Sequence, residues 1–205
     1  MHYYCHRQPG CSISGVSLMT CKLRDAQHAA DGREKMELME VIRKRESVRM
    51  YEGRPVPEDK LLKVLEAARL APSASNRQRW KFIVVRDADR RRQLSQAAGG
   101  QAHLAQAPVV IAAISTLPEY IMRCGVPAYA VDLAIAVQHI ALAAVDEGLG
   151  TCWIGAFSQD EARAVLGVPD DCKVVTLLPL GFSRQDKKEK IRKSLEEIVC
   201  HETFT

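Results

Sequence analysis

The sequence predicts an α+β domain in which helices wrap a central sheet, and two segments carry most of that prediction. Residues 108–115 (PVVIAAIS) form a continuous apolar run, which is typical of a strand buried on both faces. Residues 127–147 predict a long helix that is apolar or small almost all round. A single sheet face cannot enclose such a helix, so we expect a second subunit to pack on its other side. The alternative is a central helix within one large domain, which suits a longer chain better.

The other elements alternate between helices and strands from residue 36 onward. The apolar periodicity predicts helices at 38–44, 57–70, 88–97 and 159–166, and strands at 80–86, 151–156 and 174–182. Pro57 and Glu58 suit the first turn of the second helix, and Gly148 suits the end of the long helix. The stretch 184–193 is rich in Lys and Arg, and no internal repeat is visible.

Residues 1–35 differ from the rest because they mix His, Cys, Gly, Ser and Gln with no sustained period. We interpret them as a flexible arm or as the product of an upstream start, with Met36 as the natural beginning and 36–205 as a single domain. The alternative is a metal-binding arm, but its spacings match no ligand template. The residues of that alternative are His2, Cys5, His6, Cys11 and Cys21.

Composition excludes several classes of protein. The chain of 205 residues is 47% hydrophobic and 26% charged, as expected of an ordinary globular domain. A net charge of +4 is too mild to indicate nucleic-acid binding, but fits a small anionic ligand held by a few arginines. Seven cysteines without CxxC spacing indicate reduced thiols and no metal framework. With neither a long uncharged apolar run nor a secretory signal, we expect a cytoplasmic protein without a membrane partner.

A basic segment follows the first predicted helix. In an extended chain, residues two apart point the same way, so Arg45, Ser47 and Arg49 would share one side while Glu46 and Val48 face away. Two guanidiniums and a hydroxyl suit a phosphate, which favours bidentate donors and charge compensation. The alternative is a solvated basic face. Further along, two basic residues could complete the same phosphate cage, although alone they are merely basic: Lys190 and Arg192.

Two further segments offer contacts to a flat ligand. The first is a loop of small and polar residues, whose backbone allows close approach and whose amides suit a heteroaromatic edge: Pro72, Ser73, Ala74, Ser75, Asn76 and Gln78. Its alternative is a turn capped by Ser and Asn. The second ends the 151–156 strand, where Gly155 and Ala156 would leave N–H groups open to the ring of a flavin. Its alternative is a strand ending in a turn. Cys152 lies in the same apolar run, and we expect a buried, inert thiol there.

Taken in order, these pieces resemble the nitroreductase family of FMN enzymes. The stretches that carry the resemblance are RKRESVRMY at 43–51, PVPEDKLLKVLEAARLAPSASNRQRWKFIVV at 55–85, AVDLAIAVQHIALAAVDEGLGTCWIGAF at 130–157 and IRKSLEEIV at 191–199. Each is weak singly, whereas four in the right order, covering about 38 to 200, are a strong signal.

The resemblance implies an α/β sandwich with a mainly antiparallel sheet, in an intertwined homodimer with two FMN sites at its interface. It places Arg45, Ser47, Arg49, Lys190 and Arg192 at the phosphate and ribityl end. It places 73–76 along the isoalloxazine, with Asn76 at its pyrimidine edge and with Ile154, Gly155 and Ala156 beside N5 and O4. The 73–76 loop and the residues at 45–49 can then come from different subunits. One departure is Arg79, where the family usually has a proline.

The function implied is ping-pong transfer of hydride from NAD(P)H, through FMN, to an electron-poor nitroaromatic or quinone-like acceptor. Because the flavin carries the chemistry, we nominate no catalytic side chain. Alternatives are a dehalogenase or dehydrogenase subtype, which the short segment 115–127 disfavours, and a non-enzymatic FMN-binding or redox-sensing module. An anion- or nucleic-acid-binding module is poorly supported.

Overall fold

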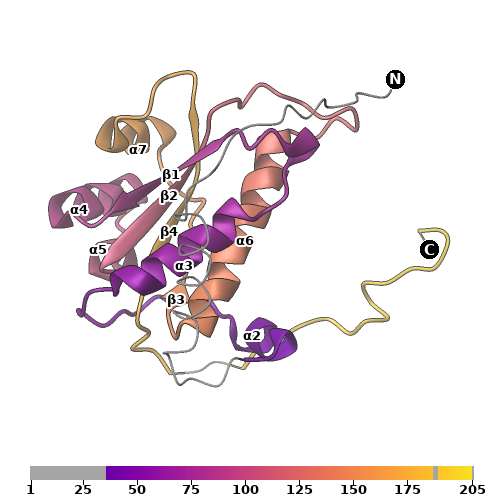
Figure 1. Cartoon of the computed structure of the whole chain (residues 1–205), viewed down its shortest axis with the longest axis horizontal. Coiled ribbons are helices and arrows are strands. Elements are labelled where there is room, and N and C mark those ends of the chain that lie inside the picture. The colour runs from indigo at the N-terminus through magenta and orange to yellow at the C-terminus, as the bar shows by residue number, and fades with distance from the viewer. Residues whose placement is uncertain (1–35, 187–188, 205) are drawn as a thin grey trace, which may run out of the picture. The chain divides into compact units, whose positions relative to one another are not determined.

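Two layers of helices cover the two faces of a four-stranded sheet in the computed structural model (Figure 1). The structure describes residues 36–186 and 189–204, and Glu37–Thr205 forms one unit. The sequence predictions for 1–35, an arm or a metal site, lie outside the described residues. The strands occur in the order β1 (Trp80–Val85), β2 (Val109–Ser115), β4 (Lys173–Gly181) and β3 (Gly150–Thr151), and all three ladders are antiparallel.

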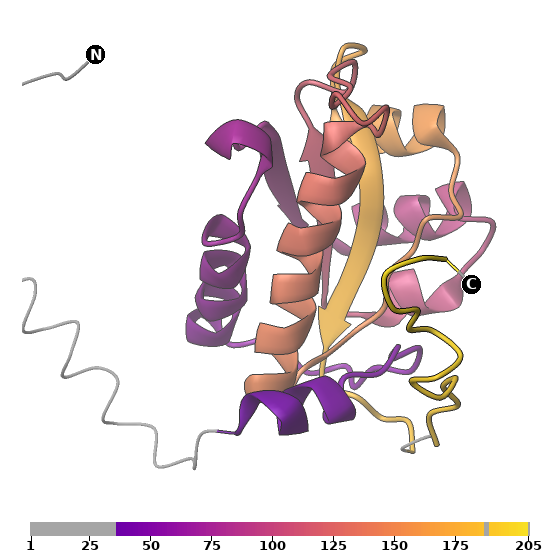
Figure 2. The same cartoon turned by 90° about the vertical axis from the view of Figure 1, so that its right-hand side faces the viewer.

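Alternation along the strands divides the core into two parts. Ile111 and Leu178 face α3 and α6, while Val110 and Leu177 face α4, α5 and α7. Figure 2 shows the sheet edge-on between these layers. Strand β2 is buried at every position, as its apolar run predicts. The predicted α+β sandwich with an antiparallel sheet is therefore confirmed.

Most helices match the predicted ranges to within two residues. They are α2 (Leu38–Lys44), α3 (Glu58–Arg69), α4 (Ala88–Ala97), α6 (Ala128–Asp146) and α7 (Gln159–Leu166). Two short elements were not predicted, α5 (Ala102–Gln106) and the 3-10 turn η1 (Ala74–Asn76). Both are too short to display a helical period, and α5 buries only Leu104.

Helix α6 runs from one end of the core to the other. Its inner face packs on the sheet through residues such as Leu133 and Ile140, which are fully buried. By length and composition α6 could cross a membrane, yet 44% of its most apolar stretch is buried inside this fold, as in a core helix. Its other side, including Val131, is exposed in the single chain. At the C-terminal end of α6, Lys60 of α3 donates to the backbone carbonyl of Glu147 (2.6 Å). The same ammonium forms an ion pair with the side-chain carboxylate of Glu147 (3.0 Å).

The predicted strand at 151–156 is wrong in its extent. Strand β3 ends at Thr151, and only Ile154 returns to the ladder, exchanging hydrogen bonds of 3.0 and 3.1 Å with Leu177. The pairing of Thr151 with Leu180 and of Ile154 with Leu177 places Cys152 opposite Pro179. Because proline has no N–H to donate, the ladder is interrupted there.

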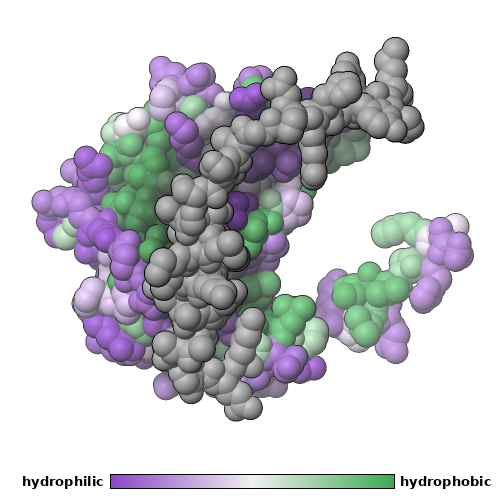
Figure 3. Space-filling view, viewed as in Figure 1, coloured by the Kyte–Doolittle hydropathy of each residue, from purple (hydrophilic) through white to green (hydrophobic). Residues whose placement is uncertain are grey.

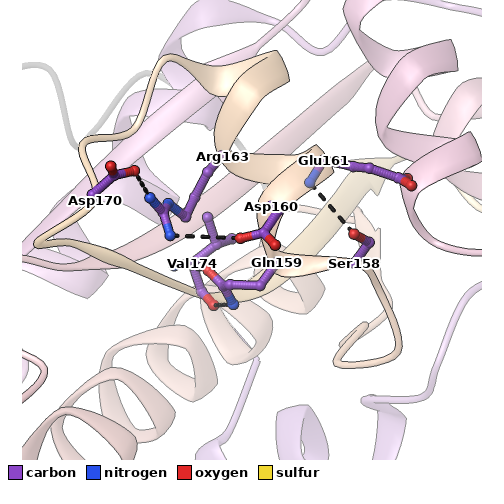
Figure 4. Close-up of polar contacts among 7 residues, drawn as sticks. All are labelled: Ser158, Gln159, Asp160, Glu161, Arg163, Asp170 and Val174. Carbon is purple, nitrogen blue, oxygen red and sulfur yellow. Dashed lines mark hydrogen bonds and ion pairs between the residues drawn. The ribbon is translucent and has the colours of Figure 1, made fainter.

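Helix α7 fixes the segment that follows this irregular edge. Its first residue, Gln159, bonds both backbone groups of Val174 on β4, donating to the carbonyl (2.8 Å) and accepting from the N–H (2.7 Å) (Figure 4). Ser158 caps the helix, and Arg163 pairs with Asp160 and Asp170. The edge segment 154–156 is therefore fixed at both ends, by the pairing of Ile154 in the sheet and by helix α7, which follows it.

Candidate functional site

The segment 45–51, called the strap below, lies beside the edge strand β3. Ser47 forms a parallel bridge with Thr151, and the N–H of Val48 donates to the Thr151 carbonyl at 2.9 Å. Val48 is only 3% exposed, and it sits so close to Gly150 that a Cβ there would lie 2.3 Å from its side chain. Glycine at 150 is therefore a condition for the strap's close approach to β3.

Tyr51 anchors the far end of the strap. Its hydroxyl lies 2.8 Å from the carbonyl of Val48 and 3.2 Å from that of Pro179, and it can donate to either. Burial raises the pKa of the Tyr51 phenol, so the group stays protonated and remains a donor. Thus the strap is tied to strand β4 at the position where the β3 ladder is interrupted.

Polar and cationic side chains of the strap gather around Cys152. Burial raises the pKa of the Cys152 thiol, while Arg49, a hydrogen bond from Ser47, and Arg45 oppose that shift. The three strap residues predicted for a phosphate therefore approach one point. Cys152 itself is buried, as the sequence predicted, but two guanidiniums that lie far away in sequence stand near it.

The chain after β4 returns to the same place. Gln185 accepts from the N–H of Arg49 (2.8 Å) and donates to the Ser47 carbonyl (3.2 Å). Lys190 donates to the carbonyls of Ile42 and Arg43 at the end of α2. Burial, followed by the nearby charges of Arg45 and Arg192, lowers the pKa of Lys190, whereas Glu46 raises it.

The structure thus brings together the residues predicted for the phosphate end. Glu46, which alternation placed on the opposite side of the strap, remains within electrostatic reach of Lys190. The cluster is therefore cationic overall but includes one neighbouring carboxylate. We call this cluster the basic socket; its cations are Arg45, Arg49, Lys190 and Arg192.

His103 of α5 also borders the basic socket and was missed from the sequence. One helical turn after it, Ala107 packs against Val48 and Tyr51, so this face of α5 is turned toward the strap. The Nε2 atom of His103 is buried without a hydrogen-bond partner among the described residues. Burial and then Arg49 lower the pKa of His103. Because α5 itself was not predicted, no sequence pattern indicated this residue.

The segment 72–79, called the small-residue loop below, has an unusual backbone. Ser75, Asn76 and Gln78 adopt positive φ values of 53°, 52° and 51°. Non-glycine residues are uncommon in this region, and they persist where the surroundings hold them. Here the Ser73 hydroxyl accepts from the N–H of Gln78 (3.0 Å), and the Gln78 amide donates to the Asn76 side chain (3.0 Å).

Asp132 connects this loop to α6. It is 8% exposed, and its carboxylate accepts from the N–H of Ala74 at 2.9 Å. Its place in the sequence is a signal for it, because an acid in an otherwise apolar helix needs a partner. The predicted site residues of this loop therefore stand at the N-terminal end of α6, with Pro72 and Ser75 exposed.

The edge segment 154–156 offers backbone donors. Ile154 is buried and paired with Leu177, whereas Gly155 and Ala156 are exposed. The N–H groups of Gly155 and Ala156 form no hydrogen bond within the described part of the chain, and the Ala156 carbonyl accepts from Gln101 (3.1 Å). These two N–H groups can therefore donate to a ligand.

The small-residue loop lies far from the other two parts within one chain. From Asp132 to the end of α6 at Asp146 is about 20 Å at the normal helical rise. The loop leads into β1, whereas the strap and edge segment border β3, at the opposite edge of the sheet. One chain therefore brings the basic socket and the edge segment together, but not the small-residue loop.

Solved structures share this layered fold. A nitroreductase family protein from Clostridium novyi NT matches with a TM-score of 0.70 and 38% identity, covering 73% of this chain and 86% of that one. An FMN-dependent nitroreductase from Clostridium difficile matches with a TM-score of 0.72 and 31% identity, covering 81% and 99%.

Sequence comparison agrees with the structural likeness. A putative NADH dehydrogenase/NAD(P)H nitroreductase of Archaeoglobus fulgidus is 34% identical over 157 residues, covering 74% of this chain and 88% of the relative. The model of the Nitroreductase family matches residues 42–182. The chain belongs to the Nitroreductase family, which confirms the resemblance carried by its motifs.

Proposed function

We propose that this protein is an FMN-dependent oxidoreductase that takes hydride from NAD(P)H and reduces a small electron-poor acceptor. The observation that carries the proposal is the pairing of a basic socket with two free N–H donors along one sheet edge. Thr151, beside the strap, and Ile154 are three residues apart, which is about 10 Å in an extended chain. The relative named an FMN-dependent nitroreductase and the one named for NAD(P)H support the same conclusion.

The residues present suit FMN at both ends. The basic socket offers guanidiniums, an ammonium and the Ser47 hydroxyl, which are the groups that a phosphate binds. The buried Nε2 of His103, without a partner among the described residues, would add a donor next to Arg49. At the other end, the N–H groups of Gly155 and Ala156 would donate to the ring.

Bound FMN supplies the two-electron chemistry, and the chain supplies position and electrostatics. Donors at Gly155 and Ala156 would stabilise negative charge on the ring. The Asn76 and Gln78 amides would meet the ring's polar edge. We assign no proton-donating catalytic residue, and we propose that donor and acceptor occupy the same face of the site in turn.

A homodimer completes the site in this proposal. Because the small-residue loop lies at the N-terminal end of α6, about 20 Å along that helix from Asp146, we propose that the loop of one subunit meets the basic socket of its partner. Apolar surface is available for this contact on α2 (Leu38, Met39 and Ile42), on α6 (Val131), and beyond β4 (Ile191 and Leu195). Figure 3 shows a further apolar area over β1.

The test combines the flavin spectrum of the protein, the rate of flavin reduction by NADH or NADPH, and the mass of the protein in solution. The protein reconstituted with FMN should show a bound-flavin spectrum, lose it quickly on anaerobic mixing with NADH or NADPH, and recover it with a nitroaromatic or a quinone. Light scattering should give twice the chain mass. Failure to bind FMN contradicts the proposal. Binding without reduction by either nucleotide indicates a flavin-storage module instead.

A further inference from the structure

Gln101 connects the turn between α4 and α5 to the edge segment 154–156. The nitrogen of its side-chain amide donates to the carbonyl of Ala98 in its own turn (3.1 Å) and to the carbonyl of Ala156 (3.1 Å). Carbonyl oxygens only accept, so the nitrogen end of the amide must face them, and its two hydrogens serve one partner each. One side chain therefore links the turn to a backbone group of the edge segment.

The turn holds Gln101 in this position. The hydroxyl of Ser95, which is 7% exposed, donates to the backbone carbonyl of Gln101 (2.9 Å). Gly99 and Gly100 have φ values of 69° and 80°, in the left-handed region that favours glycine, and they direct the chain from α4 to Gln101. Gln101 is thus fixed both at its backbone and at the end of its side chain.

The N–H of Gly155 is oriented by the sheet, without help from Gln101. The carbonyl of Ile154 accepts from the N–H of Leu177 (3.1 Å) and from the hydroxyl of Thr176 (2.9 Å). The N–H of Gly155 belongs to the same peptide group as that carbonyl. Because a trans peptide is planar, with its N–H and C=O pointing in opposite directions, the Gly155 N–H points away from β4.

The N–H of Ala156 has no such support from the sheet. It belongs to the peptide group between Gly155 and Ala156, whose N–H makes no hydrogen bond within 36–186 and 189–204. Glycine permits a wide range of backbone angles, so this group can rotate and present the Gly155 carbonyl where the Ala156 N–H stood. The sheet fixes the peptide group before it, and Gln101 fixes the one after it through the Ala156 carbonyl.

We propose that Gln101 is a positioning residue that keeps the Ala156 N–H directed at the flavin ring and thereby raises the reduction potential of bound FMN. A fixed N–H donor stabilises the ring most when reduction adds negative charge to it, whereas a carbonyl oxygen in that place would oppose the charge. This inference rests on the proposed function, and it adds a residue that acts on the flavin only through the backbone of Ala156.

The reduction potential of bound FMN tests the proposal, because a merely structural role would leave it unchanged. Gln101→Met keeps the length of the side chain and removes both donors. We expect the ratio of the Kd for reduced FMN to the Kd for oxidised FMN to rise about tenfold, as for loss of one hydrogen bond to a charged group. That change lowers the two-electron potential by about 30 mV, measured by anaerobic titration against a reference dye. Gln93→Met, at an exposed glutamine of α4, is the control and should leave the potential unchanged.

Hydrogen exchange followed by NMR gives a second readout that separates the two donors. In the FMN-loaded protein, Gln101→Met should speed exchange of the Ala156 amide while the Gly155 amide keeps its protection. The variant should still fold, because the N–H of Ser158 donates to the carbonyl of Ala97 (2.7 Å) and keeps the chain attached to this turn.

Two results would overturn the proposal. One is an unchanged potential in Gln101→Met, and the other is equal acceleration of the Gly155 and Ala156 amides, which would indicate general loosening of the segment. Failure of the proposed function is distinguishable, because it appears in the unmodified protein as absent FMN binding or absent reduction by NAD(P)H, and absent FMN binding overturns this inference with it.

Discussion

The strap and the small-residue loop, both assigned to one ligand, are held in place by different forces. The strap is anchored by packing, since Val48 and Tyr51 are 3% and 5% exposed and the chain passes directly over Gly150. The loop is largely exposed, and side-chain hydrogen bonds hold its left-handed backbone. A change of volume should therefore damage the strap, whereas loss of one polar contact should damage the loop.

Gly150→Ala should have the largest effect on the strap. A methyl group there would lie 2.3 Å from Val48, so the strap or β3 must shift. Overpacking of this kind costs about 1–3 kcal/mol of unfolding free energy. Denaturant unfolding should show that loss, and flavin-fluorescence titration should show weaker FMN binding, because Ser47 and Arg49 move with the strap.

Gly53→Ala is the matched control for that experiment. Nothing lies within 4 Å of a Cβ at Gly53, two residues after the strap. Its unfolding free energy and FMN affinity should stay close to those of the unmodified protein. If Gly150→Ala behaves like Gly53→Ala, the strap is not held by packing.

Asp132→Leu should act on the loop with little effect on stability. The substitution leaves the Ala74 N–H without its acceptor, so the strained loop loses its contact with α6. We expect the FMN dissociation constant to rise about tenfold, which corresponds to one hydrogen bond to a charged group. Asp132→Asn keeps an acceptor oxygen and should restore affinity to within about twofold. Equal losses for Leu and Asn would show that charge, not position, is the role of Asp132.

The sequence predicted these two regions unequally. The order of elements and both faces of the sheet followed from apolar periodicity, and β2 is buried throughout as expected. The sequence did not predict that Arg45 and Arg49 would lie near Cys152, because a parallel bridge between Ser47 and Thr151 joins segments about a hundred residues apart. The end of β3 at Thr151 was likewise missed, since it depends on the register that sets Pro179 opposite Cys152.

The small-residue loop was found from its composition, but its conformation was not predicted. Positive φ at Ser75, Asn76 and Gln78 contradicts local preference, so it depends on contacts with α6 that no local pattern reveals. His103 was missed because its five-residue helix is too short to show a period. The sequence therefore did not predict the positions of residues that depend on tertiary contacts.

Tyr51→Phe should weaken FMN binding less than either substitution above. It removes the hydroxyl that bonds the carbonyls of Val48 and Pro179, for which we expect a loss of about 1 kcal/mol in unfolding free energy. The ring remains packed, so the FMN dissociation constant should rise less than in Asp132→Leu. A larger rise than in Asp132→Leu would show that the strap, too, depends on a polar contact.

The smallest effect is a difference in thiol reactivity that leaves the fold unchanged. Cys152 is buried beside the strap, and burial raises the pKa of its thiol, so the reactive thiolate is scarce at pH 8. Cys124 is exposed in the segment before α6. Iodoacetamide at pH 8 should therefore label Cys124 quickly and Cys152 only slowly, as peptide mass spectrometry would measure. Gly150→Ala should speed the labelling of Cys152 alone, because a displaced strap uncovers that thiol. If Cys152 reacts as fast as Cys124 in the unmodified protein, the strap opens readily and the contrast with the loop fails.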